Sequence, residues 1–330
     1  MNLEMDKKKL RIVYMGTPDF AVEPLKKLVE NGYNVVGVVT NPDKPAGRGQ
    51  KIKESTVKQY AGSKSLKILQ PDKFKSDSFL NDLRQLNADI QIVVAFRMLP
   101  EVVWNMPKQG TFNLHASLLP QYRGAAPINW AIINGELKTG VTTFFLKHDI
   151  DTGNIIFQEE VNINKNDNAG TLHDKLMYKG ADLVLKTVDA IINNDYPQIK
   201  QKELINHESA IKQAPKIFKA DCKINWNQDI DTIYNLIRGL SPYPASWSEI
   251  TDSENQRIQL KIYTSEKEEA LHNKTAGEII TDEKNFLKVA VKGGYIYITE
   301  LQQAGKRKMS VSDFLRGFNG IKNYKFLTKV

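Results

Sequence analysis

The sequence predicts an α/β fold, in which a Rossmann-like, mostly parallel sheet domain precedes a smaller β domain. Up to about residue 195, near-continuous apolar runs alternate with helical patterns. Strands that are apolar throughout are buried on both faces, as in a parallel sheet with crossover helices. From about residue 210 the apolar segments are short and alternating, and polar turns separate them. That pattern is typical of a small β-sandwich or barrel, and we favour an OB-like barrel.

The first domain, expected over residues 1–195, begins with a strand–helix–strand unit. Leu10–Tyr14 is an apolar strand, Phe20–Asn31 has helical periodicity and stops at Gly32, and the valine-rich Asn34–Thr40 is the second strand. The later elements follow from the same patterns: helices at Asp77–Leu86 and Gly170–Ile192, and strands at Asp89–Phe96, Phe112–His115 and Val141–Leu146.

The pattern changes after this domain. Residues 196–212 are polar and lack sustained periodicity, so we expect a linker there. Residues 213–330 form the second domain, with alternating segments at Ile258–Tyr263, Lys288–Val291 and Tyr295–Leu301.

The composition limits the class and the compartment. The chain has 330 residues, 41% of them hydrophobic, and a net charge of +8 that is compatible with a polyanionic partner without demanding one. The single cysteine, Cys222, excludes an intrachain disulfide and suits a reducing cytosol. Met1–Lys9 is polar, and no run reaches the roughly 18 apolar residues of a membrane helix. We expect a cytoplasmic monomer that does not associate with a membrane.

The most informative motif runs from Asn113 to Pro120. A strand would point the amide of Asn113, the imidazole of His115 and the hydroxyl of Ser117 to one side. A loop marked by proline and glycine follows. Polar groups that meet at a strand end are typical of α/β active sites, so we predict a proton-transfer and oxyanion site here.

A catalytic imidazole works best beside a carboxylate that fixes its orientation. Asp151, in the turn sequence Asp151–Gly153, is the favoured partner, although it could also be a simple turn former. Asp149 competes for the same role.

Two further loops are candidates for ligand binding. Residues 41–51 hold two prolines, two glycines and three cations, which fits either a solvated turn or a loop that contacts phosphates. Met15–Pro18 ends the first strand without a G-x-G-x-x-G pattern, so no nucleotide cofactor is predicted.

Three motifs together resemble the 10-formyltetrahydrofolate-dependent formyltransferase family over essentially the whole chain. Met15–Ala21 is similar to the family's opening, Asn113–Pro120 to its Asn-x-His-x-Ser-Leu-Leu-Pro motif, and Asp151–Gly153 to its Asp-x-Gly element. The chain departs from the family at Ala95–Pro100, where the expected pattern is one residue longer and has a glycine after the aromatic residue.

The resemblance implies transfer of a formyl group from 10-formyltetrahydrofolate to the α-amine of methionyl-initiator tRNA. It implies a catalytic trio of Asn113, His115 and Asp151. It also implies folate contacts from Ser117, Leu118, Leu119 and Pro120. Asn113 would donate to the developing oxyanion, His115 would donate to the same oxygen or carry the amine proton, and Asp151 would orient His115. No metal is expected, because an amine attacking an activated formyl group needs neither a Lewis acid nor an activated water.

Two features favour the tRNA-acting branch of the family over the purine-pathway and amino-sugar branches. They are the loop Pro45–Gly49 and the second domain with its segment Ser241–Trp247. Arg48 and Lys51 are the first candidates for contact with tRNA. We also expect the second domain, residues 213–330, to bind tRNA, because a small β-barrel is a common nucleic-acid platform. A second basic set lies near its C-terminus: Lys306, Arg307, Lys308, Lys322, Lys325 and Lys329. An enzyme that formylates a small amine and a binding protein without turnover both remain open as alternatives.

Overall fold

The computed structural model describes residues 7–46, 51–205 and 210–328, and the chain divides into two compact units. The first comprises residues 1–124, 139–162 and 173–213, and the second comprises 125–138, 163–172 and 214–330. The sequence predicts contiguous domains, whereas two segments of the predicted first domain belong to the second unit. The reason is packing: α6 (Pro127–Ile133) contacts α8 (Ile230–Gly239), and the Asn129 amide donates to the carbonyl of Gly239 at 2.7 Å.

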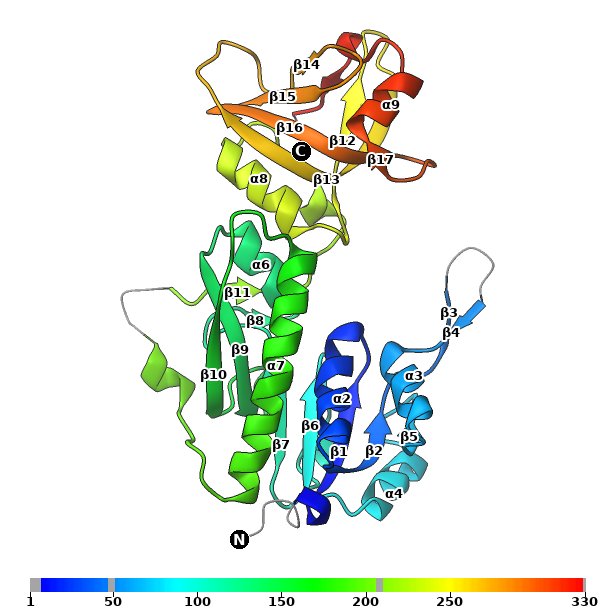
Figure 1. Cartoon of the computed structure of the whole chain (residues 1–330), viewed down its shortest axis with the longest axis vertical. Coiled ribbons are helices and arrows are strands. Elements are labelled where there is room, and N and C mark those ends of the chain that lie inside the picture. Colours follow the sequence, from blue (N-terminus) through cyan, green and yellow to red (C-terminus); the bar gives the residue numbers. More distant parts are fainter. Residues whose placement is uncertain (1–6, 47–50, 206–209, 329–330) are drawn as a thin grey trace. The chain divides into compact units, whose positions relative to one another are not determined.

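The first unit is built on a seven-stranded sheet of order β10-β9-β7-β6-β1-β2-β5 (Figure 1). Its parallel strands are β1 (Arg11–Gly16), β2 (Asn34–Val39), β5 (Ile68–Leu69), β6 (Ile90–Val94) and β7 (Thr111–His115). β9 (Lys138–Phe145) runs antiparallel to β7, and β10 (Ile155–Asn162) lies at the edge. The predicted Rossmann-like, mostly parallel sheet is confirmed.

Helices lie between or after these strands along the chain. They are α2 (Val22–Glu30), α3 (Thr56–Ser63), α4 (Asp77–Gln85), α5 (Glu101–Trp104) and α7 (Ala169–Ile192). The start of the predicted helix Phe20–Asn31 is a 3-10 turn, η1 (Asp19–Ala21), before α2 begins. Ser55 caps the N-terminus of α3, and its hydroxyl accepts from the amide of Lys58 at 3.1 Å.

Four short strands form two further pairs. β3 (Lys44–Ala46) and β4 (Lys51–Lys53) form a hairpin, and β8 (Arg123–Gly124) pairs with β11 (Gln213–Ala214).

Among the described residues, no helix is both long and apolar enough to cross a membrane.

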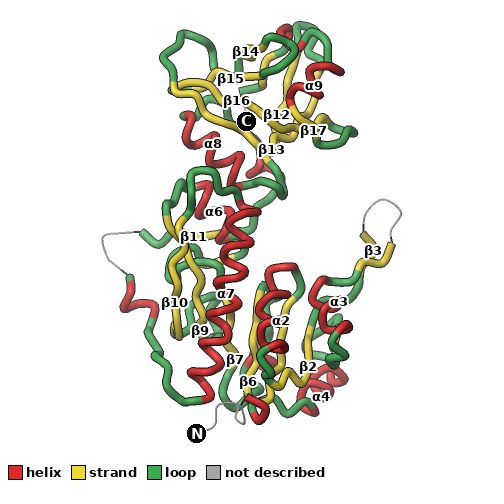
Figure 2. The backbone as a smooth tube through the Cα atoms, viewed as in Figure 1, coloured by secondary structure: helices red, strands yellow, loops and turns green. Residues whose placement is uncertain are grey.

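The second unit contains a nearly closed antiparallel barrel, whose strands are yellow in Figure 2. The strand order is β14-β15-β16-β13-β12-β18, with β17 added to β16. A bridge between Glu278 and Lys325 and a hydrogen bond from the Phe326 amide to the Gly277 carbonyl, at 2.9 Å, bring the two edges together. The strands are β12 (Ser246–Thr251), β13 (Arg257–Glu269), β14 (Ile279–Thr281), β15 (Leu287–Val291), β16 (Gly294–Gln303), β17 (Met309–Ser310) and β18 (Lys325–Phe326), and α9 (Val311–Gly317) follows β17.

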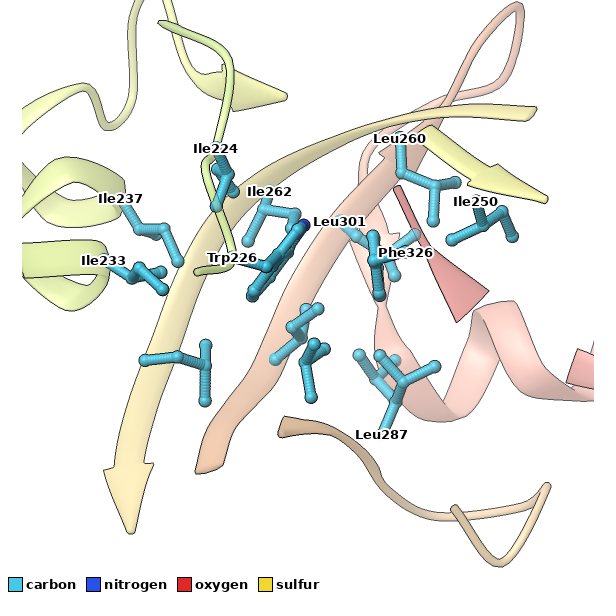
Figure 3. Packing of buried hydrophobic residues seen from close by; sticks show 14 of the residues in the cluster. Ile224, Trp226, Ile233, Ile237, Ile250, Leu260, Ile262, Leu287, Leu301 and Phe326 are labelled. Atoms are coloured by element: carbon cyan, nitrogen blue, oxygen red, sulfur yellow. The ribbon is translucent and has the colours of Figure 1, made fainter. Parts of the chain in front are cut away.

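Trp226 lies at the centre of the barrel core (Figure 3). It is fully buried, its ring centroid lies 4.7 Å from that of Phe326, and its indole Nε1 donates to the Ser248 hydroxyl at 2.9 Å. Isoleucine and leucine side chains from β12, β13 and α8 surround it, including Ile250 and Ile262. One side chain therefore contacts both the sheet and the strand that closes it.

We predict that Trp226→Ala destabilises the second unit strongly. Removing a buried tryptophan leaves a cavity and should lower the free energy of unfolding by about 3–5 kcal/mol. Urea unfolding followed by circular dichroism measures this. Tyr243→Ala is the matched control, because Tyr243 is 82% exposed and its loss should cost less than about 0.5 kcal/mol. Equal losses in the two variants would contradict the described core.

Candidate functional site

The candidate site lies at the end of β7, within the first unit. Asn113 and His115 are alternate residues of this strand, so their side chains leave the same face of the sheet. Ser117 lies beyond the end of this strand. β7 ends at His115, and the Ser117 hydroxyl turns into the following loop, where it donates to the Gln121 carbonyl at 2.6 Å.

His115 is held at one ring nitrogen. Its Nε2 lies 2.9 Å from the Tyr122 carbonyl, and because a carbonyl only accepts, Nε2 carries a hydrogen. Nδ1 faces Asp151, with 3.9 Å between Nδ1 and Oδ2. This separation is longer than a hydrogen bond, and both side chains are less than 15% exposed. Nδ1 is therefore the ring nitrogen that can exchange a proton.

Asp151 is positioned by a tight turn. It adopts a left-handed conformation with φ of 54°, and its Oδ2 accepts from the Gly124 amide at 3.1 Å. A Cβ at Gly153 would lie 1.5 Å from the Phe145 carbonyl oxygen, so only glycine allows this approach. The competing residue, Asp149, is exposed, and the structure brings Asp151 rather than Asp149 to His115.

Gln201 is a site residue that the sequence analysis missed. Within the segment expected to be a linker, it is 3% exposed, and its amide donates to the carbonyls of Asp151 at 2.7 Å and Gly153 at 2.9 Å. Its Oε1 accepts from Arg123 at 3.0 Å and 2.6 Å. Burial lowers the pKa of the Arg123 guanidinium, and the Asp151 charge opposes that shift. A single polar residue in an aperiodic stretch carries no sequence signal for this role.

Residues Ser117 to Pro120 form a tightly bonded loop. Thr142 donates to the Ser117 carbonyl at 2.6 Å and accepts from the Leu119 amide at 3.2 Å. Gln158 donates to the Leu119 carbonyl at 2.8 Å, and the Leu119 side chain packs with Phe144. Leu118 lies against Gly140, where a Cβ would approach it to 2.5 Å, and Pro120 is buried. The loop is therefore held rigidly beside the site.

Asn113 has unused hydrogen-bonding capacity. Its Oδ1 is buried and has no partner within the described part of the chain. Buried polar atoms in proteins are nearly always paired, so this oxygen is suited to a donor that arrives with a ligand.

The first candidates for contact with tRNA lie wholly or partly outside the described residues. Arg48 is outside the described residues, and so is the side chain of Lys51, whose backbone begins β4. In the C-terminal basic set, Lys308 pairs with Glu300 at 3.0 Å and Lys322 with Glu283 at 2.9 Å, while Lys329 is not described. In residues 7–46, 51–205 and 210–328, no cluster of three or more His, Cys, Asp or Glu residues could hold a metal ion.

An amide and an imidazole near the end of a buried strand, with a carboxylate beside the imidazole, are groups suited to moving protons during group transfer. Comparison with known proteins is specific about the family. The Formyl transferase model matches residues 8–188, and the Formyl transferase C-terminal domain model matches residues 216–319. The chain belongs to the formyl transferase family.

Several named proteins resemble this chain over nearly its whole length. Proteins named methionyl-tRNA formyltransferase are 61% identical in Phocaeicola vulgatus and 58% identical in Parabacteroides distasonis, each over 97% of this chain and 99% of that protein. WlaRD, a sugar 3N-formyl transferase solved with dTDP and 5-N-formyl-THF, is 26% identical with a TM-score of 0.62, over 90% of this chain and 99% of that one. HypX from Aquifex aeolicus in complex with tetrahydrofolic acid shares the fold, with a TM-score of 0.62 at 17% identity over 93% of this chain and 47% of that one.

We predict that Gln201→Leu loosens the Asp151–Gly153 turn. Two buried carbonyls lose their donor, which should lower the free energy of unfolding by about 1–3 kcal/mol. Urea unfolding measures the change. Gln198→Leu on the same segment is the control, because Gln198 is exposed and should tolerate the change within about 0.5 kcal/mol. A Gln201 variant as stable as the control would show that the turn does not depend on this side chain.

Proposed function

We propose that this chain transfers a formyl group from 10-formyltetrahydrofolate to the α-amino group of methionyl-initiator tRNA, giving N-formylmethionyl-tRNA for translation initiation. The observation that carries the proposal is the identity of 53–61% with proteins of that name over nearly the whole chain, second unit included. Asn113, His115 and Asp151, with the geometry described above, supply the chemistry.

The reaction forms a bond from the amine nitrogen to the formyl carbon and breaks the bond from that carbon to folate N10. Attack by the neutral amine gives a tetrahedral centre with a developing oxyanion. The Asn113 amide donates to this oxygen, and one such donor is worth roughly 3–4 kcal/mol. The Asn113 Oδ1, which has no partner among the described residues, accepts an N–H of the incoming amine.

His115 Nδ1 takes the amine proton and returns it to N10 as the bond to the formyl carbon breaks. Nε2 is unsuited to this task, because it donates to the Tyr122 carbonyl. The imidazolium that forms during transfer lies 3.9 Å from the Asp151 carboxylate, which stabilises it. Asp151 therefore orients His115 and balances its charge.

The folate co-substrate is proposed to lie along Ser117, Leu118, Leu119 and Pro120. Because Thr142 and Gln158 fix this loop, it presents a constant surface to the folate. Arg48, which lies outside the described residues, and Lys51, at the start of β4, are proposed to contact the phosphates of the tRNA.

An amino-sugar acceptor is the second candidate, favoured by the likeness to WlaRD. It predicts formylation of a nucleotide-linked amino sugar in the absence of tRNA. The much higher identity to the methionyl-tRNA enzymes places this candidate second.

We predict that His115→Ala slows single-turnover formylation of methionyl-initiator tRNA by about 10² or more, since general acid–base help contributes roughly 10²–10⁴. Rapid-quench measurements with 10-formyltetrahydrofolate give the rate. His148→Ala is the matched control, because the His148 side chain is 74% exposed and contacts Glu101 instead of the site. An active His115 variant would leave the function standing and remove the proposed proton carrier, whereas an inactive parent would contradict the function itself.

We predict that the double change Arg48→Ala, Lys51→Ala raises KM for the charged tRNA at least about tenfold and reduces the slope of log affinity against log salt by about 1–2. Folate binding, measured by calorimetry, should stay unchanged. Lys67→Ala, an exposed lysine elsewhere on the first unit, serves as the control. Unaltered tRNA kinetics in the double variant would rule out this hairpin as a tRNA contact.

A further inference from the structure

One short stretch of backbone, residues 121–124, supplies partners to both His115 and Asp151. The Tyr122 carbonyl accepts from His115 Nε2 at 2.9 Å, and the Gly124 amide donates to Asp151 Oδ2 at 3.1 Å. A shift of this stretch would move the imidazole and the carboxylate relative to each other. Whatever fixes residues 121–124 therefore also fixes the geometry of this pair.

Local conformational preference does not fix residues 121–124. Tyr122 has a φ of 60°, in the left-handed region that bulky residues rarely adopt, and such a conformation persists where the surrounding structure enforces it. Lys212 contributes to this, because its carbonyl accepts from the Tyr122 amide at 2.7 Å and its amide donates to Gln121 Oε1 at 2.8 Å. The stretch is held by the segment that the sequence predicts to be a linker.

Arg123 is the charged side chain of this stretch, and it reaches the Asp151 turn through one other side chain. Its Nε and Nη2 both donate to Oε1 of Gln201, at 3.0 Å and 2.6 Å. The Gln201 amide nitrogen in turn donates to the carbonyls of Asp151 at 2.7 Å and Gly153 at 2.9 Å. The backbone of the turn is therefore fixed from the same stretch whose Gly124 amide binds the carboxylate.

The Gln201 amide is matched to both of its neighbours. An arginine side chain only donates and a carbonyl only accepts, so the amide oxygen must face Arg123 and the amide NH2 must face the turn. A glutamate at this position would keep a partner for Arg123 but would turn a second oxygen toward two carbonyl oxygens. The amide therefore transmits the position of Arg123 to the turn, and a carboxylate of the same shape would not.

Charge also links Arg123 to Asp151. Burial lowers the pKa of the Arg123 guanidinium, and the charge of the Asp151 carboxylate opposes this shift. The attraction is mutual, so the guanidinium also favours the ionised carboxylate at its place beside residues 121–124. Arg123 thus acts on Asp151 in two ways, through Gln201 and through its own charge.

We propose that Arg123 and Gln201 are positioning residues of the transfer reaction. Arg123 holds Gln201, Gln201 holds the turn, and the turn presents the Asp151 carboxylate to His115. Both side chains act through Asp151 rather than on the substrate. The proposal rests on the proposed function, because Asp151 and His115 are the groups through which it operates.

The first test asks whether Arg123 acts through Asp151. Arg123→Met should lower kcat for formylation of methionyl-initiator tRNA at least about tenfold and change KM for either substrate less than about twofold. In an Asp151→Asn background the same change should lower kcat less than about twofold, because the carboxylate that Arg123 positions is already absent. Equal losses of kcat in the two backgrounds would overturn the proposal.

The control for this test is Arg84→Met. Arg84 is an exposed arginine of α4 whose Nη1 donates to Asn81 Oδ1 at 2.9 Å. Its replacement removes the same charge from the same unit and should change kcat less than about twofold. A loss equal to that of Arg123→Met would show that net charge, and not position, explains the effect.

The second test changes the amide and keeps the partner of Arg123. Gln201→Glu retains an acceptor for the guanidinium but loses the donor to the turn, so kcat should fall at least about tenfold while circular dichroism shows a folded protein. Gln198→Glu, on the same segment, is the control, because Gln198 is exposed and should tolerate the change within about twofold. If Gln201 only anchors Arg123, the glutamate variant is as active as the parent, and this result would overturn the proposal.

The third test needs no substrate. Hydrogen exchange of the Gly124 amide, followed by NMR, reports whether Asp151 Oδ2 is in place. Gln201→Glu should speed this exchange at least about tenfold and leave the amides of β6 within about twofold of the parent, because the change is confined to the turn. Unchanged exchange at Gly124 would show that the carboxylate does not depend on Gln201.

These measurements separate the two proposals. A parent that fails to formylate methionyl-tRNA, with Gly124 exchange that speeds up as expected in the variant, contradicts only the proposed function. A parent that formylates methionyl-tRNA, with Arg123→Met and Gln201→Glu variants as active as it is, contradicts only the positioning role.

Discussion

The close approach of Gly153 to the end of β9 is the constraint on which the candidate site depends. With any side chain there, the turn would collide with the Phe145 carbonyl. Because the turn can lie this close, Asp151 reaches both the Gly124 amide and the imidazole of His115. Gln201 then ties the same turn to Arg123 through four hydrogen bonds that its one side chain makes. The carboxylate is held in place before any substrate binds, which is what preorganised catalysis requires.

The imidazole of His115 is also held in place by the protein before any substrate binds. One ring nitrogen of His115 is fixed by a backbone carbonyl, so the other is left for proton exchange next to a buried carboxylate. Asn113, two residues earlier on the same strand, adds an amide whose oxygen is unpaired in the described residues. Strand alternation therefore places two of the three polar groups, and the Asp151 turn places the third.

The second unit combines an apolar core with a polar outer face on the same strands. Strand alternation turns Ile262 and Leu260 toward Trp226 and turns Lys261 outward. Closure of the barrel by β18 brings Phe326 against the buried indole of Trp226. Substitutions on the outer face can therefore be tested without disturbing the core.

The sequence by itself determined the alternation of strands and helices, the turn at Gly153 and the placement of Asn113 and His115 on one strand. These follow from local periodicity and backbone preference, which short stretches encode. Tertiary structure decided what depends on contacts between distant residues: Asp151 rather than Asp149 as the partner of His115, the burial of Gln201, the departure of Ser117 from the strand, and the assignment of α6 to the second unit. Strand register decided that Lys223, Trp247 and Lys261 are neighbours, because they lie on different segments and only pairing across the sheet brings them together.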